Sequence, residues 1–209
     1  MTGDDPVVIV VDDDPSVRSS LKLLVSTVGL RVESFESAET VLERTLPDTV
    51  SCFVLDVRLR GLSGLDFQRE LAARNIRIPI VFVTGHGDIP MSVRAMKAGA
   101  VEFLTKPFRD QDLLDAIHLA LERDRARREE EQERIQLQQR FESLTSRERD
   151  VLWMVVSGML NKQIAAQLGT AENTVKVHRR RAMEKMGAQC LAELIRMIER
   201  LKGALQKAS

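Results

Sequence analysis

The sequence has few of the features that mark membrane proteins or disulfide-stabilised proteins. No apolar run approaches the roughly 20 residues that a helix needs to cross a bilayer. The opening MTGDDP is acidic and lacks the basic and then apolar pattern of a secretory signal, so we expect a cytoplasmic protein without membrane contacts. Cysteine is scarce: Cys52 and Cys190 have no metal-site or disulfide spacing, so we expect both to be buried apolar filler.

Charge is plentiful but unevenly distributed, although 31 Lys and Arg residues balance 31 Asp and Glu residues. Residues 1–120 hold 13 basic against 18 acidic side chains, and residues 121–140 hold 6 against 6. Residues 141–209 hold 12 basic against 7 acidic side chains. An acidic first part and a basic last part suggest two domains with different partners, of which the basic one is expected to meet nucleic acid.

The first 120 residues alternate five short apolar runs with helical patterns, and Asp14 is expected to cap the first helix. This alternation predicts an α/β domain with a doubly wound parallel sheet covered by helices on both faces. Right-handed crossovers favour the flavodoxin-like strand order 2-1-3-4-5, which places ligands at the carboxyl ends of the strands. The expected strands are residues 7–11, 31–35, 51–55, 79–83 and 101–104.

The remainder is predicted to be helical and to divide into a linker and a second domain. Residues 121–142 are densely charged and contain no Pro or Gly, which favours a stiff, solvated helix or linker. A helical extension of the preceding helix that pairs with a second subunit is the sharper interpretation of the same residues. We therefore expect domains at 1–120 and 143–209, joined by a charged helical linker at 121–142.

The second domain is predicted to be all-α, with four helices. Thr145 and Glu148 have the spacing of a capping box at the start of the first helix. Asn161 can cap a short second helix, and Gly169 supplies the tight turn before a longer helix over residues 171–186.

Polar side chains follow four of the apolar runs in the first domain. Asp12 and Asp13 follow the first run, and Asp56 follows the third. Thr84 follows the fourth run, and Lys106 stands just after the fifth. Any one of them alone would be an ordinary cap or surface residue, but their coincidence at one sheet edge favours a functional pocket. Three carboxylates in one crevice repel and need a cation, for which oxygen ligands select Mg²⁺ or Ca²⁺.

The residue types in this pocket suit phosphoryl transfer. Asp56, at the centre of the sheet, is the best candidate for a carboxylate nucleophile that forms an aspartyl-phosphate. Lys106 and Mg²⁺ can neutralise the charge of the transferred group, while Thr84 can donate a hydrogen bond to one of its oxygens. Asp12 and Asp13 are the better metal pair, and the backbone carbonyl of Arg58 can complete the coordination.

Three stretches resemble the receiver domain of bacterial response regulators: VVDDDPSVR, FVLDVRLRGLSGLD and PIVFVTGHGDIPMSVRAMKAGAVEFLTKPF. Within them, TGHGDIPM and AMKAGAVEFLTKPF are similar to the FixJ subfamily. The resemblance implies a CheY-like fold, Mg²⁺ as cofactor, a sensor histidine kinase as partner, and Asp13 as the principal metal-ligating acid beside Asp12. It also implies that Phe103 is an aromatic switch that turns inward on phosphorylation and that the Lys106–Pro107 bond is cis.

The last third contains two helical patterns joined at a glycine, which fits a helix-turn-helix or a plain αα-hairpin. Basic side chains shift the balance, because Lys176, Arg179 and Arg180 fall on the exposed part of the second helix. Such side chains read guanine edges and hold phosphates. Asn173 and Thr174 can meet phosphate at the start of that helix.

LTSRERDVLWMVVSGMLNKQIAAQLGTAENTVKVHRRRAMEKM is similar to the LuxR/NarL four-helix DNA-binding domain. The similarity implies base contacts from three residues: Lys176, Val177 and Arg180. It implies contacts to the DNA backbone from four others: Asn161, Lys162, Thr174 and Arg179. The apolar stripe of the final helix is either a dimer contact on DNA or core; it contains Leu191, Leu194, Ile195 and Ile198.

We therefore expect a transcription regulator and not an enzyme. The only reactions expected of the chain are the transfer of a phosphoryl group to itself and the hydrolysis of its own aspartyl-phosphate. Phosphorylation would favour a homodimer, through residues 89–104, on double-stranded promoter DNA, with RNA polymerase as a further candidate partner. A relay module without DNA function is disfavoured by the basic helix. An enzymatic output is disfavoured because no Ser/His/Asp or Cys/His arrangement is present, and His86 is expected to be a loop or surface residue.

Overall fold

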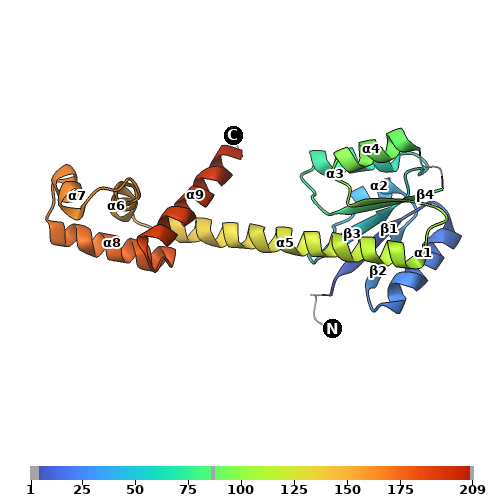
Figure 1. The fold of residues 1–209 in the computed structure, drawn as a ribbon, viewed down its shortest axis with the longest axis horizontal. Coiled ribbons are helices and arrows are strands. Elements are labelled where there is room, and N and C mark those ends of the chain that lie inside the picture. Colours follow the sequence, from blue (N-terminus) through green and yellow to red (C-terminus); the bar gives the residue numbers. More distant parts are fainter. Residues whose placement is uncertain (1–4, 86–87, 208–209) are drawn as a thin grey trace. The chain divides into compact units, whose positions relative to one another are not determined.

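A computed structural model describes residues 5–85 and 88–207, with side chains through residue 201; His86 lies outside the described residues. The chain divides into two compact units, Met1–Arg128 and Glu129–Ser209, each of which is described by itself (Figure 1). Among the helices in these ranges, none is both long enough and apolar enough to cross a membrane.

The first unit contains a parallel sheet in the order β2-β1-β3-β4-β5, which confirms the flavodoxin-like prediction. Its strands are β1 (Val7–Val11), β2 (Arg31–Phe35), β3 (Ser51–Leu55), β4 (Ile80–Thr84) and β5 (Glu102–Thr105). Val11 lies opposite Leu55, so Asp12 and Asp56 leave the sheet side by side. β4 and β5 begin and end one residue later than predicted; Pro79 has no N–H with which to start the ladder.

Helices cover both faces of this sheet, as Figure 1 shows. They are α1 (Pro15–Thr27), α2 (Ala38–Leu42), α3 (Gly64–Ala73), α4 (Ile89–Lys97) and α5 (Asp110–Glu142). Val7, Ile9 and Val11 pack with α2, α3 and α4, whereas Val8 and Val10 pack with α1 and α5. Alternate side chains of one strand thus enter two different cores, which explains why the central strands are apolar throughout.

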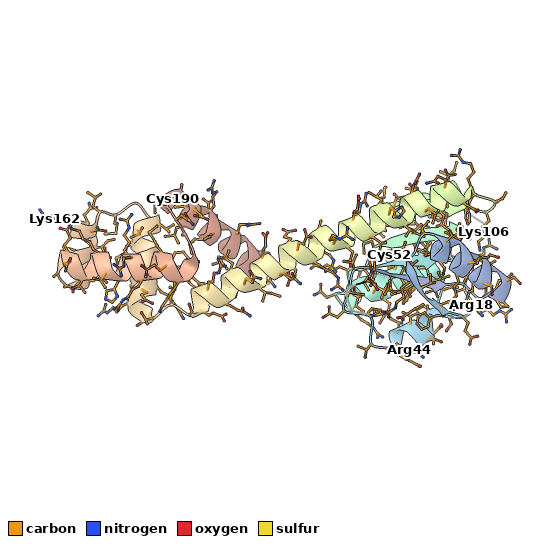
Figure 2. All side chains as sticks on the ribbon, turned by 90° about the horizontal axis from the view of Figure 1, so that it is seen from below. Arg18, Arg44, Cys52, Lys106, Lys162 and Cys190 are labelled. Atoms are coloured by element: carbon orange, nitrogen blue, oxygen red, sulfur yellow. The ribbon has the colours of Figure 1, made fainter. Side chains whose placement is uncertain are left out.

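Two local predictions about this unit are confirmed. The Asp14 carboxylate accepts from the Ser16 amide at 2.8 Å and caps α1. Cys52 is fully buried, and burial raises the pKa of its thiol far above the usual range. The same expectation for Cys190 is wrong, because this residue lies exposed in the turn before the final helix (Figure 2).

The charged linker is a continuation of α5, which runs unbroken from Asp110 to Glu142, so the predicted helical extension is confirmed. Within the first unit this helix is fixed by a fully buried carboxylate, that of Asp124. Its two oxygens accept from Arg127 at 2.7 Å and from Arg128 at 3.0 Å, and one also accepts from the Ser51 amide at 3.0 Å. The helix is therefore joined by charged hydrogen bonds to the start of β3.

The second unit is helical, with α6 (Ser146–Val156), α7 (Asn161–Leu168), α8 (Glu172–Met186) and α9 (Leu191–Lys207). Its core includes Val151, Ile164 and Met186. Leu194 and Ile198 of α9 are buried in the same core. Of the two roles considered for the apolar stripe of this helix, a dimer contact or core packing, these two residues have the second.

The helix starts of the second unit follow the predictions in part. The capping box of Thr145 and Glu148 is present. The Thr145 amide donates to the Glu148 carboxylate at 2.9 Å, and the Glu148 amide donates to the Thr145 hydroxyl oxygen at 3.3 Å. Asn161 does not cap α7: the cap is Leu160, whose amide donates to the Gln163 side chain at 2.8 Å. Gly169 has the left-handed conformation, φ 62°, that the turn to α8 requires.

Replacing Asp124 with alanine should lower the free energy of unfolding of the first unit by roughly 3–5 kcal/mol, because two arginines and a buried amide lose their shared acceptor. Urea unfolding of the full chain, followed by circular dichroism, measures this change. The matched control is Asp115→Ala, an exposed carboxylate of the same helix, which should change stability by less than about 0.5 kcal/mol. Equal stability of the two variants would contradict the assignment.

The buried Glu148 carboxylate leads us to expect that the second unit loses stability in acid. Glu148 is buried, and the hydrogen bond from Lys185 at 2.7 Å holds the pKa of its carboxyl below the usual range. Because this pKa is lower in the folded state, the ion pair stabilises the folded protein fully at pH values above the ordinary carboxyl pKa of about 4.3. The stabilisation is lost as the pH falls through the pKa that Glu148 has in the folded state. Urea midpoints from about pH 7 to about pH 3 should therefore fall more steeply for the wild type than for Glu148→Gln; parallel curves would refute the pairing.

Candidate functional site

An acidic pocket lies at the carboxyl edge of the sheet, where the sequence predicts it. Carboxylate oxygens of Asp12, Asp13 and Asp56 all lie within 4.8 Å of one another. Asp12 is buried, while the other two are half-buried and open to the edge of the sheet. Hydrated Mg²⁺ takes oxygen ligands at an open site, so this donor set fits the predicted metal.

Lys106 forms ion pairs with two of these acids. Its Nζ lies 2.9 Å from Asp12 Oδ2 and 3.8 Å from Asp56 Oδ2. Its amide donates to the carbonyl oxygen of Thr84 at 2.8 Å, so the two residues are joined at the ends of β4 and β5. The Lys106–Pro107 bond is cis, as the resemblance implies, and Figure 2 shows Lys106 at the edge of the first unit.

The loop after β3 folds closely around Asp56. The Arg58 amide donates to Asp56 Oδ1 at 3.1 Å, and a Cβ added to Gly64 would lie 2.2 Å from the Asp56 carbonyl oxygen. Arg60 donates to Asp13 Oδ2 at 3.1 Å, although its side chain is 91% exposed and the pair is correspondingly weak. Arg60 and Gly64 were not predicted from the sequence; the two glycines of GLSG, residues 61–64, are the signal from which a tight loop beside Asp56 could have been predicted.

Phe103 lies on β5, two strands away from Asp56. Its ring is half-buried and tilted against that of Phe82, with the ring centroids 6.0 Å apart. It packs against the core on the α4 side of the sheet, and Thr84 is buried at the end of the adjoining strand. The pocket residues predicted from the sequence thus occupy one edge, with Phe103 beside it.

A basic surface lies on the second unit, along α8. The side chains of Lys176 and Arg180 are 57% and 80% exposed, and Val177 between them is 42% exposed. Lys176 pairs with Glu172 at 3.2 Å and Arg180 with Glu184 at 3.0 Å. These exposed pairs along one helix are weak, so a phosphate or a base can replace the carboxylates at little cost.

The residues predicted to contact the DNA backbone lie around the same helix. Arg179 donates to the Asn161 side chain at 3.2 Å, which links α8 to the start of α7. Both residues line a hollow of about 390 Å³ that also includes Lys176 and Arg180. Thr174 and Lys162 are exposed, and Figure 2 shows Lys162 projecting from α7.

Comparison with known proteins covers most of the chain. Residues 8–118 match the model of the response regulator receiver domain, and residues 142–198 match that of the bacterial regulatory proteins of the luxR family. The chain is 59% identical to nodulation protein W of Bradyrhizobium diazoefficiens, over 93% of this chain and 86% of that protein. It is 43% identical to the transcriptional regulatory protein FixJ of Azorhizobium caulinodans, over 90% of this chain and 89% of that protein.

Solved structures give the same result. The response regulator StyR is 51% identical, with a TM-score of 0.86 that covers 94% of this chain and 99% of that one. Full-length FixJ from B. japonicum is 35% identical, with a TM-score of 0.56 over 95% of this chain and 98% of that one. The chain is therefore a two-component response regulator of the FixJ type, a transcription regulator with a receiver domain and a LuxR-type DNA-binding domain.

Proposed function

We propose that Asp56 accepts a phosphoryl group from a sensor histidine kinase and that this phosphorylation promotes binding of the chain to promoter DNA as a dimer. The observation that carries the proposal is the meeting of three carboxylates with Lys106 at one sheet edge. A receiver domain implies a kinase partner, and a LuxR-type domain implies DNA as the other.

In the proposed transfer, a carboxylate oxygen of Asp56 attacks the phosphorus of a phosphohistidine. The new oxygen–phosphorus bond forms as the phosphorus–nitrogen bond breaks, and the imidazole leaves with the electron pair. The carboxylates of Asp12, Asp13 and Asp56 would hold Mg²⁺ together with the backbone carbonyl of Arg58. The bound ion supplies charge neutralisation for the phosphoryl oxygens.

Lys106 and Thr84 have complementary roles in this proposal. The Lys106 ammonium, 3.8 Å from Asp56 Oδ2, is close enough to turn from Asp12 toward a phosphoryl oxygen on Asp56. The Thr84 hydroxyl donates a hydrogen bond to another oxygen. Phe103 then turns inward into the space that the movement of Thr84 opens, which alters the α4–β5 surface.

This surface is the proposed contact between two receiver domains, within residues 89–104. Ile89 of α4 is 80% exposed, and Val93 and Met96 are each 43% exposed. Apolar side chains exposed in a row on one helix favour burial against a partner. Dimerisation brings two DNA-binding domains to adjacent half-sites.

On the DNA, we assign base contacts to Lys176, Val177 and Arg180 of α8. Contacts to the DNA backbone are assigned to four residues: Asn161, Lys162, Thr174 and Arg179. We retain the division into a receiver at residues 1–120, a linker at 121–142 and a DNA-binding domain at 143–209. The proposed compartment is the cytoplasm, where bacterial DNA lies, and RNA polymerase is a candidate partner once the chain is bound there.

Replacing Asp56 with asparagine should abolish labelling by a radioactive phosphodonor such as acetyl phosphate, because the amide is not a nucleophile. Removal of Mg²⁺ with a chelator should abolish labelling of the wild type as well. Asp115→Asn, which changes an exposed carboxylate of α5, should label like the wild type. Label that persists on Asp56→Asn would remove Asp56 from its role.

Removing the side chain of Lys176 or Arg180 should weaken DNA binding by roughly 1–3 kcal/mol each. Gel shifts with genomic fragments, with and without beryllofluoride as a phosphoryl mimic, measure this effect. Arg196→Ala is the matched control, since it removes the same charge from the exposed side of α9. Absence of a shift in both states would favour a phosphorelay module without DNA function.

A further inference from the structure

The last turns of α5 are built into the core of the second unit. Leu137 is buried with Val151 and Ile164, and Phe141 packs against the same cluster with its ring 5.8 Å from that of Trp153. These turns precede residue 142, where the match to the luxR family begins. The helix end is thus part of the DNA-binding unit although the family match does not include it.

Arg140 joins this helix end to the end of α8. Its Nη1 donates to the carbonyl oxygen of Met186, the last residue of α8, at 3.3 Å. Gly187 follows with φ 75°, and a Cβ added there would lie 2.8 Å from Arg140 Nη1. The guanidinium therefore occupies the space that a side chain at position 187 would fill.

This contact has a clear electrostatic basis. The last carbonyls of a helix lack partners within the helix and carry partial negative charge. Gly187 and Ala188 donate their amides to the carbonyls of Glu184 and Met183, while Arg140 donates to that of Met186. Arg140 thus completes the C-terminal cap of α8 with a cation.

A second cation holds the same turn of α8 to the connection between α5 and α6. Lys185 Nζ lies 2.7 Å from Glu148 Oε2 and donates to the Ser143 carbonyl oxygen at 3.2 Å. The C-terminal turn of α8 is consequently attached to the end of α5 and the start of α6, on either side of the connection. The exposed residues Lys176 and Arg180 belong to the same rigid helix.

We propose that Arg140 is a positioning residue for DNA recognition. It fixes the C-terminal turn of α8 against the end of α5 and thereby sets the orientation in which Lys176, Val177 and Arg180 meet base edges. Arg140 acts through the helix and does not itself touch a base. This inference rests on the proposed function, because it assumes that α8 reads DNA.

The experiment compares Arg140→Met, which keeps an aliphatic chain but loses the donors, with Arg140→Lys, which keeps a charged donor. Met and Lys both favour helices, so α5 is preserved. Arg134→Met is the matched control, because Arg134 is an exposed arginine of the same helix paired with Glu131. The probes are a duplex selected by the wild-type chain from a random-sequence pool and a scrambled duplex of equal length.

Arg140→Met should bind the selected duplex about tenfold more weakly, since a charged hydrogen bond that orients α8 is lost. Its affinity for the scrambled duplex should match that of Arg134→Met, because sequence-independent binding depends on charge and not on base register. Arg140→Lys should regain most of the lost affinity. Circular dichroism at the assay temperature shows that each variant is folded; Arg140→Gln, too short to reach Met186, replaces Arg140→Met if the latter unfolds.

Two results would overturn the proposal: an unchanged affinity of Arg140→Met for the selected duplex, or an equal loss on both duplexes. The second would show a general structural role or a direct phosphate contact. Failure of the wild-type chain to select any duplex from the pool would instead refute the proposed DNA-binding function, on which the role of Arg140 depends.

Discussion

The balance of charge at one edge of the receiver sheet governs much of what this chain can do. Parallel register brings Asp12 and Asp56 together, because Val11 and Leu55 are paired partners on adjacent strands. Such a group of acids is tolerable only with positive charge nearby, and Lys106 provides it from the end of β5. The fold thus holds the Asp56 carboxylate, the proposed phosphoryl acceptor, beside two further acids and 3.8 Å from the Lys106 ammonium.

Both units use buried acids in a similar way away from this edge. Asp124 in the first unit and Glu148 in the second are almost inaccessible to solvent, and each is bonded to a backbone amide and to at least one basic side chain. Each holds an end of one secondary-structure element to another: Asp124 joins α5 to β3, and Glu148 joins α6 to α8. Because a carboxylate accepts several hydrogen bonds at once, one side chain can fix such a junction.

The sequence was sufficient for the sheet, the acidic pocket and the helix-turn-helix, since each depends on local periodicity or on residues at strand ends. It was insufficient where a contact joins distant parts of the chain. The burial of Asp124 depends on Ser51, 73 residues earlier, and the contact of Arg140 depends on Met186. Within a densely charged segment, neither residue differs in pattern from its solvated neighbours. Asn161 is not the cap because it is already the first residue of α7, and its side chain accepts from Arg179 on another helix instead.

The two cysteines differ in a way that gives the molecule a natural chemical handle. The Cys52 thiol lies inside the sheet, and its raised pKa leaves little of the reactive thiolate. Cys190 is exposed between α8 and α9. A maleimide fluorophore added to the native chain will therefore attach to Cys190 in the DNA-binding unit, and changes in that unit can be followed by spectroscopy without any amino-acid substitution.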